Sequence, residues 1–261
     1  MATICAAVIA RDEEKNIERC LRSLAWADSM LVIIDDRTTD GTASIAETCG
    51  AAVTVRHFLD YARQRNAALE VADTEWVLFV DADEIVTPEL ASEVRTVTAD
   101  ASATAGYWIP RKNILFGHWI RHAGWSPDYQ LRLLRRRCAH YQEGRTVHEL
   151  VDLDGAAEYL KCLLIHYNYD TLQQFIVKQR AYTAMTALDM FRRGIRVKPQ
   201  NFLLQPWRQF WRRYILLQGY RDGWLGLLLS ALLAYYELKT YLRLRILWKS
   251  YPEKSSTNLS P

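Results

Sequence analysis

The first 90 residues of the chain alternate short apolar runs with segments of helical periodicity. The apolar runs have strand length and occupy residues 3–10, 30–34, 51–56 and 76–80. Such alternation predicts parallel strands joined by crossover helices, in a sheet that helices cover on both faces. The ligand site of such a sheet lies beyond the carboxyl ends of its strands. We therefore expect an α/β fold with its functional site at that edge.

Acidic residues stand where two of these runs end. Asp81 and Asp83 follow the last run, and Asp35 and Asp36 follow the second. Two carboxylates at the end of a rigid strand can bind a divalent cation together with a diphosphate, because Mg²⁺ and Mn²⁺ take oxygen ligands. A lone Asp-x-Asp pattern is common, however, and solvated carboxylates are the simpler interpretation of it.

Asp35, Asp36 and Arg65 are candidates for binding a nucleoside. Asp35 and Asp36 can accept hydrogen bonds from a base or a ribose, although a tight turn capped by Thr39 or Asp40 explains them equally well. Arg65 lies in a predicted helix at residues 60–72, where it can reach a base or a phosphate, or pair with a surface acid.

The order of four motifs resembles that of family 2 glycosyltransferases with the GT-A fold. These motifs are IARDEEKNI at residues 9–17, IDDRTTDGT at 34–42, QRNAAL at 64–69 and VDADE at 80–84. Four later motifs resemble the bacterial branch that includes lipopolysaccharide-core β-glucosyltransferases. They are GWSPD at 124–128, QLRLLR at 130–135, VHE at 147–149 and HYNY at 166–169. The resemblance implies a GT-A (Rossmann-like), mainly parallel sheet with flanking helices.

This resemblance also implies an activity, a cofactor and a set of site residues. The expected reaction transfers a hexose, glucose from a UDP-sugar in the first instance, to a membrane-associated glycan or lipid-linked acceptor. The metal, Mg²⁺ or Mn²⁺, is expected on Asp81, Asp83 and His166. The nucleotide sugar is expected on Arg11, Glu13, Asp35, Asp36, Arg65, Asp81, Lys178 and Arg180. For His166 a structural role, and for Lys178 and Arg180 a solvated helix face, are the alternatives.

An inverting displacement needs a carboxylate base that takes the proton of the acceptor hydroxyl. The candidates are Glu149 and Asp128. We favour Glu149, since a Glu beside His148 in an otherwise basic segment is hard to explain by solubility alone.

Charge divides the chain into an acidic and a basic part. Residues 1–100 carry 9 Lys and Arg against 19 Asp and Glu, whereas residues 171–250 carry 14 against 3. The basic part includes an uncharged apolar segment at residues 223–236, which is shorter than the roughly 20 residues that span a bilayer. With Trp, Tyr and Arg around it, this segment is typical of a helix at an anionic membrane surface. An ordinary buried helix is the alternative, and a nucleic-acid partner is not expected.

These observations give a domain plan and a location. We expect a catalytic domain at residues 1–170, a helical membrane-contacting region at 171–251 and a disordered tail at 252–261. Five scattered cysteines form neither a disulfide framework nor a zinc site, and residues 1–5 show no secretory leader. The expected location is therefore the cytoplasmic face of the inner membrane.

Two other classes of protein have part of this pattern. A non-catalytic nucleotide-sugar-binding or scaffold protein would keep the fold without turnover. A phosphoacceptor domain of the response-regulator kind would use Asp35 and Asp36, but it would leave Asp83 and the basic C-terminal part unexplained.

Overall fold

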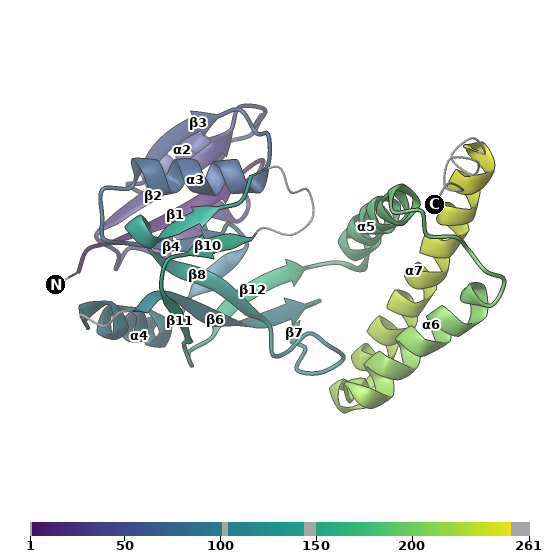
Figure 1. Cartoon of the computed structure of the whole chain (residues 1–261). Helices are drawn as coiled ribbons and strands as arrows, with labels where there is room; N and C mark the ends of the chain where they lie inside the picture. The colour runs from purple at the N-terminus through teal and green to yellow at the C-terminus, as the bar shows by residue number, and fades with distance from the viewer. Residues whose placement is uncertain (1, 101–103, 144–149, 252–261) are drawn as a thin grey trace. The chain divides into compact units, whose positions relative to one another are not determined.

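A computed structural model of the chain describes residues 2–100, 104–143 and 150–251 (Figure 1). The chain divides into two compact units. The first comprises residues 1–112 and 127–167, and the second comprises residues 113–126 and 168–261.

The first unit begins with the alternation of strands and helices that the sequence predicts. In chain order, its elements up to residue 99 are β1 (Ile4–Ala10), α1 (Ile17–Arg22), β2 (Ser29–Asp35), α2 (Thr42–Thr48), β3 (Ala52–Arg56), α3 (Tyr61–Val71), β4 (Trp76–Asp81), β5 (Glu84–Val86) and α4 (Pro88–Ala99). The predicted α/β start of the chain is thus confirmed.

The four strands β3, β2, β1 and β4 lie side by side and are parallel. Ile9 of β1 is in register with Ile33 of β2 on one side and with Asp81 of β4 on the other. Because all these strands run the same way, their carboxyl ends form one edge of the sheet. Asp35 and Asp81, which end β2 and β4, therefore lie at the same edge, on either side of β1.

Side chains of these strands alternate between two apolar layers. Ile4, Ala6 and Val8 of β1 belong to a core that also contains residues of α1, α2 and α4. Cys5 and Ala7 point to the other face, where α3 contributes Ala62, Ala68 and Leu69 among others. Helices cover both faces of the parallel strands, as predicted.

The sheet continues with strands of mixed direction. The later strands are β6 (Thr104–Leu115), β7 (His118–Trp119), β8 (Tyr129–Arg135), β9 (Ala139–Tyr141), β10 (Val151–Leu153), β11 (Ala156–Tyr159) and β12 (Leu164–Tyr169), with a 3-10 turn η1 (Arg136–Cys138). Strand β8 is antiparallel to β4, and the sheet order is β3-β2-β1-β4-β8-β6-β12-β5. At the end of this order, the antiparallel pair β12 and β5 places His166 opposite Glu84, while β9 and β10 form a separate two-stranded sheet.

The second unit is mainly helical. Its elements are α5 (Leu172–Arg192), α6 (Asn201–Trp211), a π-helical turn η2 (Arg212–Leu216), a 3-10 turn η3 (Gly219–Asp222) and α7 (Gly223–Ser250). Helix α5 starts at a capping box, in which Thr171 Oγ1 accepts from the backbone N–H of Gln174 and the Gln174 side chain accepts in return. None of the helices in the described part of the chain combines the length and the apolarity needed to cross a bilayer.

The apolar segment at residues 223–236 forms the first half of α7, and it is only partly buried. Leu225, Leu229 and Tyr236 pack with Phe175 of α5, so the segment contributes to the core of its own unit. Trp224, on the other side, remains 69 % exposed. Helix α6 also exposes large apolar side chains, among them Leu203 and Trp207, and it has no fully buried residue.

Candidate active site

Asp81, the last residue of β4, lies between two arginines from different elements. Arg65 of α3 places Nη2 3.3 Å from Oδ1 of Asp81, and Arg132 of β8 contacts Oδ2. Burial by itself would raise the pKa of the Asp81 carboxyl, but the charges of Arg132 and Arg65 outweigh it and hold that pKa well below its usual range. The two guanidinium groups therefore favour the ionised form of Asp81 at the edge of the sheet.

Glu84 is fully buried behind Asp81. Its Oε2 accepts the backbone N–H of Asp81 at 2.8 Å, while Oε1 lies 3.4 Å from Arg111 and 3.5 Å from Arg132. Burial raises the pKa of Glu84, and the negative charge of Asp81 raises it further, against the opposing charge of Arg132. Glu84 thus fixes the turn after β4 through the Asp81 amide.

Asp83 and His166 form a second polar pair. His166 Nε2 lies 3.5 Å from Asp83 Oδ2, and the backbone oxygen of Asp83 accepts from the N–H of Tyr167 at 2.9 Å. The structure therefore brings together two of the three residues expected to bind a metal. The third, Asp81, directs its carboxylate to Arg65 and Arg132 instead.

The donor set of this pair fits a hard or borderline divalent cation. A carboxylate oxygen and an imidazole nitrogen suit Mn²⁺ and, for the carboxylate, Mg²⁺. Among the described residues no group of three His, Cys, Asp or Glu side chains forms a closed metal site. A cation with few protein ligands keeps positions for water or substrate phosphate, as Mg²⁺ commonly does.

Asp128, one of the two candidate bases, is held by Arg111. Nη2 and Nε of Arg111 lie 2.7 Å and 2.8 Å from Oδ2 of Asp128, and Gln130 Nε2 donates to Oδ1 at 2.8 Å. Both carboxylate oxygens are thus already hydrogen-bond acceptors. The same Arg111 faces Glu84, so the guanidinium links Asp128 to the turn after β4. Glu149 and His148 lie outside the described residues.

The loops after β1 and β2 meet at Asp35. Arg37 binds this buried carboxylate through Nη2 at 2.7 Å and Nε at 3.0 Å, and Arg11 Nη1 lies 3.7 Å away. The hydrogen bonds from Arg37 lower the pKa of Asp35 well below its usual range, against the effect of burial. Asp36 faces outward to His57, at 2.8 Å.

Glu13 and its neighbours connect the same two loops. The backbone N–H of Glu13 donates to Thr42 Oγ1 at 2.8 Å, and its carboxylate accepts from Asn16. Asp12, with a φ of 53°, turns the chain sharply after β1 and accepts from the N–H of Thr39. The structure therefore places Arg11, Glu13 and Asp35 around one end of β1.

Lys178 and Arg180, expected near the diphosphate, belong to helix α5 in the other unit. Lys178 Nζ donates to the backbone oxygen of Asn168 at 3.4 Å and lies over the ring of Tyr169. Their role toward the nucleotide stays a prediction.

Three residues of this site were not predicted from the sequence: Glu84, Arg111 and Arg132. Arg132 lies inside the motif QLRLLR at residues 130–135, but nothing in that pattern tells which arginine points to β4. The antiparallel pairing of β8 with β4 decides this, because it sets Leu133 opposite Leu78 and turns the neighbouring Arg132 toward Asp81.

Comparison with known proteins assigns this arrangement to a family. The family model described as "Glycosyl transferase family 2" matches residues 5–149, which is more than half of the chain. The match includes both acidic strand ends and the motif that contains Arg65.

Relatives along most of the chain carry related names. An uncharacterized glycosyltransferase of Rickettsia typhi is 27 % identical over 243 residues, which cover 85 % of this chain and 82 % of the relative. The lipopolysaccharide core biosynthesis glycosyltransferase LpsC of Rhizobium meliloti is 26 % identical over 229 residues, covering 85 % and 84 %.

A solved structure supports the fold. The mannosyltransferase PcManGT from Pyrobaculum calidifontis, determined with GDP-Man and Mn²⁺, superposes with a TM-score of 0.52 at 14 % identity, covering 96 % of this chain and 88 % of that one. The GT-A (Rossmann-like) arrangement expected from the sequence is confirmed.

Proposed function

Since this chain belongs to glycosyl transferase family 2, we propose that it is an inverting hexosyltransferase that moves glucose from a UDP-sugar to a membrane-associated glycan or lipid-linked acceptor. The observation that carries the proposal is the placement of Asp35 and Asp81 at one sheet edge, with Arg11 beside the first and Arg65 beside the second. Ionised carboxylates with attached guanidinium groups offer acceptors to a nucleoside and donors to its phosphates.

A divalent cation, Mn²⁺ or Mg²⁺, is proposed at Asp83 and His166, with Asp81 as a further ligand. The imidazole and the carboxylate already lie within 3.5 Å of each other. When bound, such a cation supplies positive charge that stabilises a departing diphosphate. Arg65 and Arg132 contribute fixed positive charge to the same region, since both are paired with Asp81.

The proposed step is a single displacement at the anomeric carbon. The acceptor hydroxyl oxygen forms the new glycosidic bond while the bond to the nucleoside diphosphate breaks, and a carboxylate takes the hydroxyl proton. Glu149 is the proposed base. Asp128 is the second candidate, and its hydrogen bonds to Arg111 and Gln130 suit a positioning role as well.

The proposed acceptor class rests on one relative and on one surface. LpsC, which aligns along most of this chain, is named for lipopolysaccharide core biosynthesis. An acceptor of that kind is anchored in a membrane, so the enzyme must work close to a lipid surface. We place this chain on the cytoplasmic face of the inner membrane.

Helix α6 offers the surface for such a contact. Leu203, Trp207 and Trp211 follow one another at intervals of four residues along one helix face, and Leu203 and Trp207 are 76 % and 58 % exposed. Arg208 and Arg212 lie about 100° further around the helix. An exposed apolar face beside cations is the pattern of a helix that lies in the interface of an anionic membrane.

The donor proposal is tested by thermal unfolding of the full chain with UDP-, GDP-, CMP- and dTDP-sugars, each with and without MnCl₂. We expect the largest rise in Tm with UDP-glucose and Mn²⁺ together, because a ligand at about 100 times its Kd adds roughly 2.7 kcal/mol to the free energy of unfolding. The variant Asp83→Asn should lose the metal-dependent part of that rise. If no nucleotide sugar raises Tm with or without MnCl₂, the proposed donor site is wrong.

A further inference from the structure

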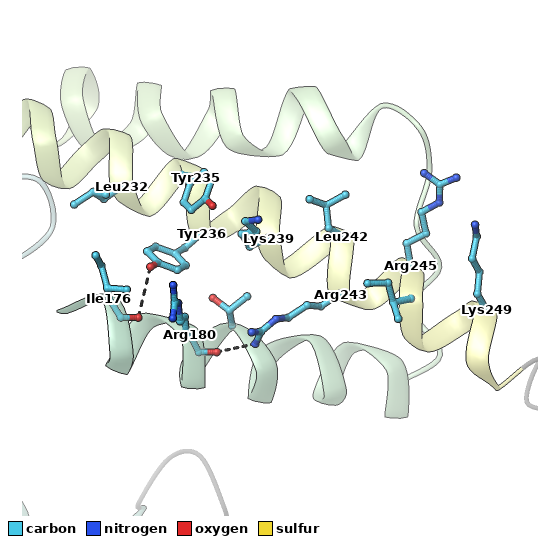
Figure 2. A pocket seen from close by; sticks show the side chains of 12 residues that line it. Ile176, Arg180, Leu232, Tyr235, Tyr236, Lys239, Leu242, Arg243, Arg245 and Lys249 are labelled. Carbon is cyan, nitrogen blue, oxygen red and sulfur yellow. Dashed lines mark hydrogen bonds between the residues drawn. The ribbon is translucent and has the colours of Figure 1, made fainter. Parts of the chain in front are cut away.

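A groove of about 790 Å³ runs between α5 and α7 within the second unit (Figure 2). Its volume lies in the range of sites that hold small molecules. Arg243 crosses it from α7, and its Nη1 donates to the backbone oxygen of Arg180 at 2.7 Å. Tyr236 closes another part, with its hydroxyl 3.5 Å from the backbone oxygen of Ile176. None of the proposed active-site residues of the first unit lines this groove.

The charged side chains that line the groove are all cationic. Its charged residues are Arg180, Lys239, Arg243, Arg245 and Lys249, and its lining includes no Asp or Glu. Within the described part of the chain no carboxylate pairs with any of the five, although Lys239 lies over the ring of Tyr235 and Arg245 over that of Phe202. Several uncompensated cations around one hollow create a site for an anion.

Apart from Thr183, the uncharged lining is aliphatic or aromatic. Ile176, Leu232, Leu242 and Ile246 supply aliphatic surface, and Ile246 is 61 % exposed. In Figure 2, Leu232 lies beside Tyr235 and Tyr236, and Lys239 and Leu242 follow along α7 toward Arg243. A free phosphate ion or a sugar would leave this aliphatic surface in water. A molecule with an anionic head and a hydrocarbon chain would cover both kinds of lining.

From this combination we infer that the groove binds one anionic membrane lipid, with its phosphate held by Arg180, Lys239 and Arg243 and its acyl chain over Leu242 and Ile246. Lysine and arginine ends donate several hydrogen bonds to phosphate oxygens, and arginine can do so in a bidentate manner. The inference deepens the proposed membrane contact and rests on it. It adds recognition of a headgroup to the unspecific insertion of α6.

A nucleic acid is the less suitable occupant. Single strands bind along grooves in which aromatic side chains stack on successive bases. Here Tyr235 is the exposed aromatic residue of the lining, and aliphatic residues occupy most of the apolar positions. One short hydrocarbon chain fits that lining better than a row of bases.

The test measures binding of a single short-chain lipid to the full chain by titration calorimetry, below the lipid's micelle concentration. The probe is dioctanoyl phosphatidic acid, and dioctanoyl phosphatidylcholine, inorganic phosphate and a short single-stranded oligonucleotide serve as comparisons. We expect one binding site for phosphatidic acid, with the other three at least about tenfold weaker, the equivalent of about 1.4 kcal/mol. If inorganic phosphate binds as tightly as phosphatidic acid, the groove is a site for a small anion and the lipid inference is wrong. If the oligonucleotide binds more tightly, the groove is a nucleic-acid site and the lipid inference is also wrong.

Variants locate the binding. Lys239→Gln with Arg243→Gln should weaken the binding of phosphatidic acid at least about tenfold, since each substitution removes a charged hydrogen bond to the phosphate. Arg192→Gln with Lys198→Gln removes two exposed cations of the same unit outside the groove and should leave the affinity unchanged. Arg243 also connects α7 to α5 through its hydrogen bond to Arg180. The single variant Lys239→Gln therefore measures the loss of a groove cation while that hydrogen bond is kept.

A second arm separates this inference from the proposed membrane contact. Flotation with vesicles of phosphatidylcholine containing phosphatidylglycerol reports the contact itself. If the chain floats but the monomeric lipid does not bind, or binds the groove variants equally well, the groove inference is overturned while the membrane contact stands. If neither occurs, both proposals fail, and the donor titration still tests the transferase.

Discussion

Arg65 of α3 and Asp81 of β4 face each other at 3.3 Å, which joins two sequence motifs that are separated by the end of α3, a loop and most of β4. Arg65 is nearly buried, and its guanidinium also lies over the rings of Phe79 and Tyr141, at 5.1 Å and 5.6 Å from their centroids. Aromatic rings fix the plane of a guanidinium and so its direction. Because Arg65 is held in this way, it also fixes the orientation of the Asp81 carboxylate at the edge of the sheet.

Replacement of Arg132 should destabilise the first unit. Its side chain is 6 % exposed and faces both Asp81 and the fully buried Glu84. Loss of the guanidinium in Arg132→Met leaves Glu84 with Arg111 as its cationic neighbour, and breaking a buried pair from one side costs about 3–5 kcal/mol. We expect a loss of roughly 3 kcal/mol in urea unfolding. Arg135→Met, at a more exposed arginine of the same strand, should cost less than half of that.

Asp83→Asn should impair catalysis without unfolding the protein. Asp83 is partly exposed, so the substitution leaves no unpaired buried charge, but it weakens the pair with His166. We expect kcat/KM for a UDP-sugar to fall about 100-fold, the upper range for losses around a metal site. Asp73→Asn, at an exposed acid before β4, is the matched control. Equal activity of the two variants would remove Asp83 from the metal site.

Acid unfolding should depend on Asp35. Its pKa is lowered in the folded state by Arg37, so between that pKa and the unfolded value of about 3.9 the unfolded chain binds more protons. The stabilisation is therefore complete above about pH 4 and is lost as the pH falls. Asp35→Asn should flatten the acid side of a plot of unfolding free energy against pH.

A double-mutant cycle checks the cause of this dependence. Arg37→Gln removes the two side-chain hydrogen bonds that lower the pKa of Asp35 and keeps the one from the backbone N–H, so it should flatten the same part of the curve, but less than Asp35→Asn does. The double variant Asp35→Asn with Arg37→Gln should flatten the curve no further than Asp35→Asn alone. A steep acid limb that persists in Arg37→Gln would assign the pH dependence to other carboxylates.

The sequence predicted the parallel strands and their acidic ends because each depends on a local pattern. The run ending at Asp81 is apolar throughout, as a strand covered on both faces must be. Arg111 and Glu84 could not be identified that way. Their contact joins β6 to the turn after β4, and it depends on the order of strands in the sheet rather than on any short motif.

The C-terminal part illustrates a second limit. Composition alone identified residues 223–236 as the most apolar segment, yet Leu225 and Leu229 of this segment pack against α5. Helix α6 includes polar residues, one arginine and a proline, so its average composition is unremarkable. Only the helical spacing of Leu203, Trp207 and Trp211, together with their exposure, distinguishes it as the proposed face for a lipid surface.

Close packing at the start of α7 makes Gly226 sensitive to substitution. A Cβ atom at this position would lie 1.8 Å from the backbone oxygen of Gly219, where no flexible side chain can move aside. Overpacking of this kind costs typically about 1–3 kcal/mol, and backbone contact puts Gly226→Ala at the upper end. Leu227→Ala, at the exposed neighbouring position, should cost little. Chemical denaturation of both variants measures the difference.

Membrane binding should depend on the aromatic face of α6. Trp207→Ala with Trp211→Ala removes two exposed indole rings that stack on each other and pack on no core of the second unit, so the fold should keep its stability. Burial of one such ring in the lipid interface contributes about 1.5–3 kcal/mol, so the pair should lower the vesicle-bound fraction at least about tenfold. Tyr61→Ala with Leu59→Ala removes exposed apolar residues of the first unit and serves as the control. If the tryptophan variant still floats, the membrane contact lies on another surface. If it floats at low salt but not at high salt, the contact depends on the charges of Arg208 and Arg212.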